Sequence, residues 1–286
     1  MPYYVFAWIA SFSAGIYVVI MKLTSKYSIK NPWFFNFLWA IAVMFFTGIP
    51  ALFRGASLPQ DWLPVILASI FSALFHAGFI FSVSLLDVST LSPLFNFRSV
   101  FAVLLGVLFL GEYFSTLQWI IIGGIVIAGV LATIDENFSL KSFFKPAIAV
   151  GLLTMLFLAI SNALTKQALV NNELWTANFW IALLKLIVII PTIPLFYKDF
   201  SRIKFNQIAS ISLLAVFSTF ANVTSSIGYR TNVGVSSLIM AVPFSMIMVF
   251  ILSFFAPKLL EKHSLKVYAL RFIAAIIMIY GTTYLY

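Results

Sequence analysis

The chain has no cysteine, and its 286 residues include only eight acidic residues and two histidines. Without cysteine there can be no disulfide, no thiolate metal site and no cysteine nucleophile. The shortage of acids and histidines leaves little material for a metal centre or an enzyme active site, and we expect neither metal nor cofactor. The sequence also lacks a G-x-x-x-x-G-K-[ST] loop, which argues against ATP hydrolysis by this chain.

Charged residues of any kind are scarce, at 9% of the chain, whereas hydrophobic residues make up 63%. A helix needs about 20 consecutive apolar residues to cross the hydrocarbon of a bilayer. Runs of about that length fill almost the whole chain, at residues 4–21, 33–53, 63–86, 91–110, 117–134, 147–165, 175–197, 207–229, 234–256 and 267–286. The sequence therefore predicts an all-α integral membrane protein with ten transmembrane helices.

The formal net charge of +9 resides mainly in the loops. In a membrane protein this pattern is typical of topology signals and contact with anionic lipids, so we expect membrane lipids and no nucleic acid as partners. Loops on the side of the N-terminus hold only Arg54, Lys166 and Arg230. The opposite loops hold many more cations, namely Lys22, Lys26, Lys30, Lys141, Lys145, Lys198, Arg202, Lys204, Lys258, Lys262 and Lys266. The charge count predicts both termini outside, in a prokaryotic inner or plasma membrane.

The chain carries a weak internal duplication. A shift of 144 positions aligns Lys22 with Lys166, Ser92 with Ser236, and Ile49-Pro50 with Ile193-Pro194. We therefore predict two repeats of five helices, residues 1–137 and 138–286. Because five is odd, the two repeats must enter the membrane from opposite faces, which is the inverted-repeat architecture of many secondary transporters.

One segment resembles a known family. Residues 99–112 read SVFAVLLGVLFLGE and are followed by a glycine-rich run from Gly123 to Gly129. This pattern resembles the EamA-type members of the drug/metabolite transporter (DMT) superfamily, and the resemblance implies a ten-helix, twofold-repeated carrier of small organic solutes. The resemblance also implies both termini in the cytoplasm, which is opposite to the orientation that the charge count predicts. Two departures are clear: Ser99 stands where the family usually has proline, and the second half ends in Phe254-Phe255-Ala256 instead of Leu-Gly-Glu.

Three basic residues fall within the predicted spans. Arg98 lies about two turns into the fourth span, Lys185 near the middle of the seventh, and Arg271 close enough to an interface to snorkel. Charges inside a membrane are costly and usually face a wet cavity or a partner, so Arg98 and Lys185 are candidate substrate-binding residues. His76, at the centre of the third span, is a candidate proton carrier or a hydrogen-bonded packing residue.

Neutral polar and aromatic side chains complete the candidate site. The asparagines in the spans bind either a neighbouring helix or a ligand. We include Tyr17, Asn162, Asn178, Asn222 and Trp180 as candidate substrate-binding residues. The other tryptophans near span ends, including Trp39, suit the interfacial belts. The glycines of the fifth span allow close packing, either within the monomer or across a homodimer.

The predicted spans have no acid at their centres. Asp87 and Glu112 lie at span ends, where we expect a helix terminus and water to satisfy them. A cavity lined by Arg98, Lys185 and His76 without an acid would favour an anion or the carboxylate of a zwitterion. We therefore predict a secondary transporter of a small polar metabolite, such as an amino acid or a solute bearing carboxylate or phosphate, working by alternating access. The alternatives are an exporter of amphipathic or cationic solutes, a channel or receptor, and a membrane-embedded enzyme, which the lack of an acid pair disfavours.

Overall fold

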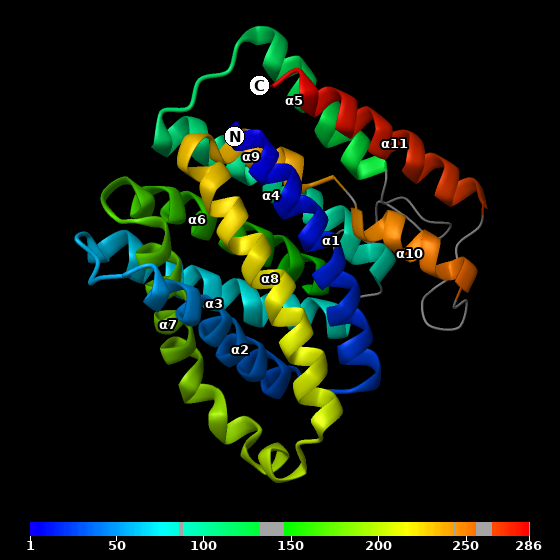
Figure 1. The fold of residues 1–286 in the computed structure, drawn as a ribbon. Helices are drawn as coiled ribbons and strands as arrows, with labels where there is room; N and C mark the ends of the chain where they lie inside the picture. The colour runs from blue at the N-terminus through cyan, green and yellow to red at the C-terminus, as the bar shows by residue number, and fades with distance from the viewer. Residues whose placement is uncertain (86–87, 132–145, 243, 256–264, 286) are drawn as a thin grey trace.

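The computed structural model describes residues 1–85, 88–131, 146–242, 244–255 and 265–285. Every regular element in these ranges is helical, as predicted (Figure 1). The α-helices are α1 (Tyr3–Tyr27), α2 (Pro32–Phe53), α3 (Trp62–Leu85), α4 (Val88–Leu110), α5 (Thr116–Leu131), α6 (Pro146–Asn171), α7 (Leu174–Ile189), α8 (Phe205–Thr231), α9 (Val233–Met240), α10 (Phe244–Phe255) and α11 (Leu265–Thr283). Two 3₁₀ helices, η2 (Ile190–Leu195) and η3 (Tyr197–Arg202), follow α7.

Within the described residues, 6 helices are long and apolar enough to cross a membrane: α1, α2, α3, α6, α8, and α7 with its 3₁₀ extension. Shorter apolar helices lie at Phe97–Leu110, Thr116–Ala128 and Tyr268–Thr283. The chain is thus a multi-pass, all-helical membrane protein.

Two of the predicted spans are not continuous α-helices. The run 234–256 is divided into α9 and α10, with non-helical backbone at Ala241 and Val242. The sequence has Pro243 directly after this point, and that residue lies outside the described residues. The run 175–197 changes from α-helix to 3₁₀ at Ile190, and two prolines fall in the 3₁₀ segment. Proline has no N–H to donate to the preceding turn, so it ends an α-helix readily.

The helices pack in recurring pairs (Figure 1). α3 packs along α6, and α1 packs along α8. α3 also contacts α7, and α2 contacts α8. Three more pairs are α2 with α7, α4 with α9, and α5 with α11, the last of which lie side by side in Figure 1. Each of these pairs joins one helix from residues 1–131 to one from residues 146–285.

Hydrogen bonds between the segments that link consecutive helices define the two ends of the bundle. At one end the link after α2 meets the α6–α7 link, where Gln60 N donates to Asn172 Oδ1 over 2.7 Å. We call this end, which also carries the N-terminus, the terminal face. At the other end Asn31 Nδ2 donates to Asp199 Oδ2 over 2.7 Å, which joins the α1–α2 link to the α7–α8 connection.

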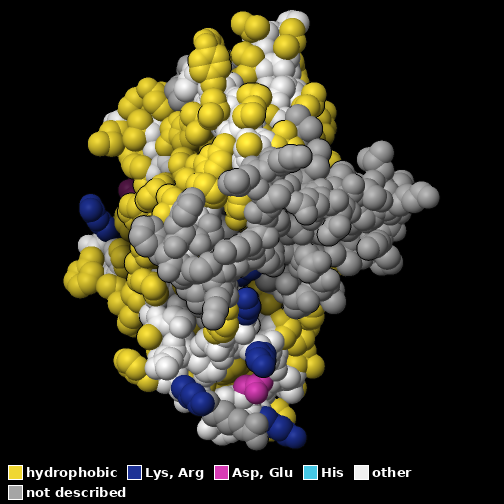
Figure 2. Space-filling view, turned by 90° about the vertical axis from the view of Figure 1, so that its right-hand side faces the viewer, with side chains coloured by type: hydrophobic (Ala, Val, Ile, Leu, Met, Phe, Trp, Pro, Cys, Tyr) yellow, Lys and Arg dark blue, Asp and Glu magenta, His cyan; other side chains and the backbone are white. Residues whose placement is uncertain are grey.

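The outer surface of the bundle is suited to lipid. Figure 2 shows hydrophobic side chains over much of the face turned to the viewer, with Lys and Arg gathered toward one end. Large apolar side chains such as Leu108 and Ile120 are about two-thirds or more exposed. Gly123 and Gly124 are also exposed, and no atom would lie within 4 Å of a Cβ added to either. These two glycines therefore do not pack against another described helix of the same chain, and the dimer remains a prediction.

Candidate functional site

A cavity of about 80 Å³ lies among five helices. Its walls come from α2 and α3 in the first half of the chain and from α6, α7 and α8 in the second. One water molecule needs roughly 10–15 Å³ of such space, so the cavity can be hydrated. It is lined by Val43, Thr47, Ser72, Phe75, His76, Leu158, Ser161, Asn162, Thr165, Asn178, Ile181, Ala182, Lys185, Asn222, Ser225, Ser226 and Tyr229. Five of the eight residues chosen from the sequence meet here: His76, Asn162, Asn178, Lys185 and Asn222.

Lys185 is the cationic side chain of this wall, and it is only 2% exposed. It makes no hydrogen bond or ion pair with any residue in the described parts of the chain. None of the acids that the structure describes lines the cavity. A buried ammonium without a counter-charge is costly in a membrane protein, and such groups usually mark a solute or ion pathway.

Two neighbouring polar groups also lack partners among the described residues. His76 Nδ1 is buried and without a hydrogen bond. The amide of Asn162, a residue that is 8% exposed, makes no hydrogen bond with any described residue. Buried polar groups are normally satisfied, so these atoms together with Lys185 form a set that water or a solute must complete.

The other two asparagines differ from each other. Asn178 is engaged within the protein, because its Nδ2 donates to Leu174 O over 2.9 Å and its Oδ1 accepts from Ser226 Oγ over 3.0 Å. Asn222 is exposed, and its side-chain amide makes no hydrogen bond with any described residue. Asn178 therefore ties α7 to α8, whereas Asn222 is free to contact water or solute.

An aromatic row extends from the cavity toward α1. The His76 ring stacks on Trp39 with centroids 4.1 Å apart, and Trp39 contacts Tyr17 at 6.2 Å. Trp39 Nε1 donates to Ser218 Oγ over 3.0 Å. The prediction of an interfacial Trp39 is wrong, because this residue is 2% exposed and lies in the core. Tyr17 does not line the cavity itself.

Trp180 lies apart from this cavity, although the sequence suggested it as a ligand contact. Its Nε1 donates to Ser57 O over 2.8 Å, and its ring meets Trp62 edge to face at 5.0 Å. Trp180 thus anchors the link after α2 at the terminal face.

Arg98 binds the protein itself. One of its terminal nitrogens donates a hydrogen bond to the carbonyl oxygen of Met240, which is the last residue of α9. The interruption between α9 and α10 leaves carbonyls at this point without helical donors. Tyr229, which lines the cavity, donates its hydroxyl to Met240 Sδ over 3.2 Å. Arg98 is therefore positioned behind the cavity wall, on the helix break.

Glu112, the last residue of the family-like segment, binds the other end of α9. Its Oε1 accepts from Val233 N over 2.6 Å and its Oε2 from Gly234 N over 2.9 Å. Lys166 Nζ lies 2.8 Å from Glu112 Oε1 and also donates to Thr231 O over 3.2 Å. We expected a helix terminus and water to satisfy this span-end acid, and the terminus is that of α9.

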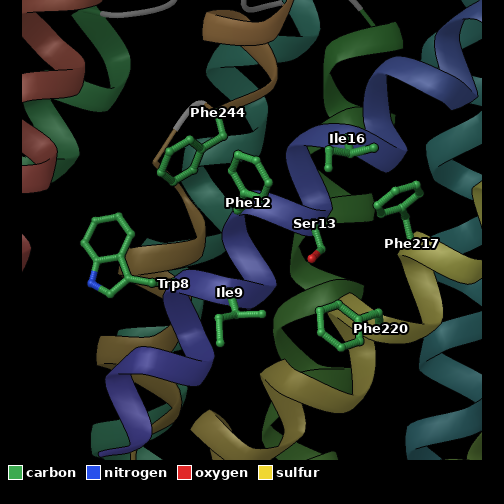
Figure 3. Close-up of a pocket in the computed structure, with 8 residues that line it drawn as sticks. All are labelled: Trp8, Ile9, Phe12, Ser13, Ile16, Phe217, Phe220 and Phe244. Atoms are coloured by element: carbon green, nitrogen blue, oxygen red, sulfur yellow. The ribbon is translucent and has the colours of Figure 1, made fainter.

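A second hollow of about 490 Å³ lies outside the polar cavity, between α1, α8 and the start of α10. Figure 3 shows its lining, which is apolar except for Ser13: Trp8, Ile9, Phe12, Ile16, Phe217, Phe220 and Phe244. Phe12 and Phe220 are each about half exposed. This groove offers little to a polar solute and faces the lipid side of the bundle.

The arrangement, a lipid-exposed helical bundle around a small polar hollow, is that of a membrane transporter. The sequence model of the EamA-like transporter family matches residues 1–134. This match confirms the resemblance to the DMT superfamily, to which the EamA-like family belongs, over these residues. A solved crystal structure is similar with a TM-score of 0.72 and 15% sequence identity, covering 96% of this chain and 94% of that chain, which shows a shared fold. No curated protein matches the sequence.

Proposed function

We propose that the protein is a secondary transporter that carries a small anionic or zwitterionic metabolite through the polar cavity by alternating access. The observation that carries this proposal is Lys185, a buried ammonium on the cavity wall without a counter-charge among the described residues. A carboxylate or phosphate group on the solute would supply that counter-charge. An organic cation would meet an unfavourable field.

The other lining residues fit a small polar solute. The unpartnered Asn162 amide can both donate and accept hydrogen bonds, and His76 Nδ1 offers one more polar contact. Phe75 and Ile181 add an apolar surface to the same cavity. Such a mixture of few polar groups and apolar walls is typical of small-molecule sites.

The helix pairing supports the inverted repeat, an architecture found in many transporters that work by alternating access. If α1 to α5 correspond to α6, α7, α8, α9 with α10, and α11, then the α3–α6 pair corresponds to α8–α1, and α3–α7 to α8–α2. The pairs α2–α7, α4–α9 and α5–α11 each join corresponding helices. The proposed repeat boundary, between residues 137 and 138, lies outside the described residues. The cavity lies between the two halves, where inverted-repeat transporters bind their solutes.

Transport by purified protein in proteoliposomes tests this proposal. We expect saturable uptake of a labelled anionic or zwitterionic solute, selected first by thermal stabilisation across amino acids, carboxylates, sugar phosphates and nucleotides, since a ligand of the folded state raises its melting temperature. If organic cations inhibit the labelled uptake more strongly than every anionic solute does, the anion preference is contradicted and a cation exporter is favoured. A conductance that rises linearly with solute concentration, without saturation, would indicate a channel.

The membrane orientation is a separate prediction. The charge count predicts both termini outside, with the α7–α8 connection facing the cytoplasm. A cysteine at Asp199 should then resist a membrane-impermeant thiol reagent in intact cells and react after permeabilisation. An Arg54→Cys variant, on the terminal face, should show the opposite behaviour. Labelling of the Asp199→Cys variant in intact cells would reverse the orientation.

A further inference from the structure

We propose that Glu112 and Lys166 form a latch that closes the cavity at the terminal face. This inference rests on the proposed function, because it assigns these residues a role in alternating access. The latch joins α4 of the first half to α6 and α9 of the second through three hydrogen bonds to one carboxylate. It therefore connects parts that must move relative to one another if the cavity is to open on this side.

The latch lies directly beside the cavity. Thr165 and Tyr229, which line the cavity, are the chain neighbours of Lys166 and Arg230 at the same ends of α6 and α8. Lys166 Nζ donates hydrogen bonds to the Glu112 carboxylate, which binds the start of α9, and to Thr231 O at the end of α8. Lys166 therefore holds α6 and α8 together against the start of α9. Separation of these helix ends would open a path from the terminal face to Thr165.

Local backbone geometry holds the carboxylate in place. Gly111 has φ 66°, a left-handed conformation that L side chains rarely adopt, and the chain turns back so that Glu112 N donates to Gly106 O over 3.0 Å. A Cβ on Gly106 would overlap the Glu112 carboxylate, and one on Gly234 would lie 3.0 Å from Oε2. The carboxylate thus occupies a slot between two glycines, and the side chain of Glu112 is only 4% exposed.

The duplication places no acid at the position of the second half that corresponds to Glu112. The shift of 144 positions that aligns Lys22 with Lys166 aligns Glu112 with Ala256. The side chain of an alanine cannot accept the hydrogen bonds that the Glu112 side chain accepts, so the aligned position itself cannot form the same contact. Charge-assisted hydrogen bonds to a buried carboxylate are among the stronger polar contacts. The carrier without solute should therefore rest with its terminal face closed.

Thiol accessibility tests the latch without any knowledge of the solute, because the chain has no native cysteine. A Thr165→Cys probe is combined with Glu112→Gln, Lys166→Gln or the control Glu173→Gln, which alters an exposed acid on the same face. Arg54→Cys and Lys198→Cys, at exposed positions on opposite faces, report which face each vesicle preparation presents. We expect impermeant reagent from the terminal face to label the probe at least about tenfold faster with either latch variant and no faster with the control.

Unchanged labelling in folded Glu112→Gln and Lys166→Gln proteins would overturn the latch, as would an equal increase in the Glu173→Gln control. If Glu112→Gln fails to fold, Lys166→Gln decides alone, because it leaves the two backbone bonds of Glu112 in place. Uptake is measured separately in proteoliposomes. If the unmodified protein transports none of the solutes, the proposed function is contradicted, but the labelling result still tests the latch.

Discussion

Replacing Lys185 with methionine is expected to abolish transport and, at the same time, to make the protein more stable. Loss of one member of a buried charge pair weakens binding by about 2–5 kcal/mol, so uptake of an anionic solute should fall by roughly 30-fold or more. The empty protein, in contrast, no longer buries an uncompensated ammonium. Insertion scales assign a central lysine a cost of about 2.5–3.5 kcal/mol, part of which hydration of the cavity relieves.

The measurements are uptake in proteoliposomes and thermal unfolding in detergent. We expect a gain of about 1–2 kcal/mol in stability, which corresponds to a rise of roughly 2–8 °C in melting temperature for a chain of this size. Lys198→Met, at an exposed position outside the α-helices, is the control and should leave both quantities unchanged. A Lys185→Met protein that transports normally would remove the basis of the proposed function.

Replacing Arg98 with methionine is expected to lower stability and slow turnover. The guanidinium donates to Met240 O at the end of α9, and a buried carbonyl left without a donor costs about 1–3 kcal/mol. We expect the junction between α9 and α10 to rearrange during the proposed transport cycle, so its loosening should reduce the maximal rate about tenfold. Arg98→Lys should recover only part of both losses, since an ammonium lacks the planar fork of the guanidinium.

Kinetics separate this role from direct solute binding. A positioning role predicts a lower melting temperature and a lower maximal rate with little change in KM. If Arg98→Met instead keeps its melting temperature and raises KM for anionic solutes, then Arg98 contacts the solute, as the sequence alone suggested. Arg54→Met, at an exposed position on the terminal face, is the matched control.

The polar cavity was largely predictable from the sequence. Lys185, His76 and the three asparagines stand out because each interrupts an apolar run, and the cost of a polar group in hydrocarbon forces such residues inward. Once they face inward on packed helices, they have few places to meet. The type of these residues and their depth in the apolar runs are enough to predict that they meet.

The partners of Arg98, Glu112 and Trp39 could not be predicted in the same way. The acceptor of Arg98 arises only because the ninth run is interrupted after Met240, which lies 142 residues away in the chain. Glu112 was expected at a helix terminus, but nothing local identifies that terminus as α9. Trp39 sits near a span end by position, yet α2 packs so that this side chain stacks on His76.

Because Trp39 stacks on His76, the intrinsic fluorescence of Trp39 should report on the contents of the cavity. Indole emission responds to the polarity and charge of whatever lies against the ring, and His76 connects the indole of Trp39 directly to the cavity. A solute that enters beside His76 should therefore change the intrinsic fluorescence. The chain has 7 tryptophans, so the signal from this one is the difference between the unmodified protein and a Trp39→Phe variant during a titration.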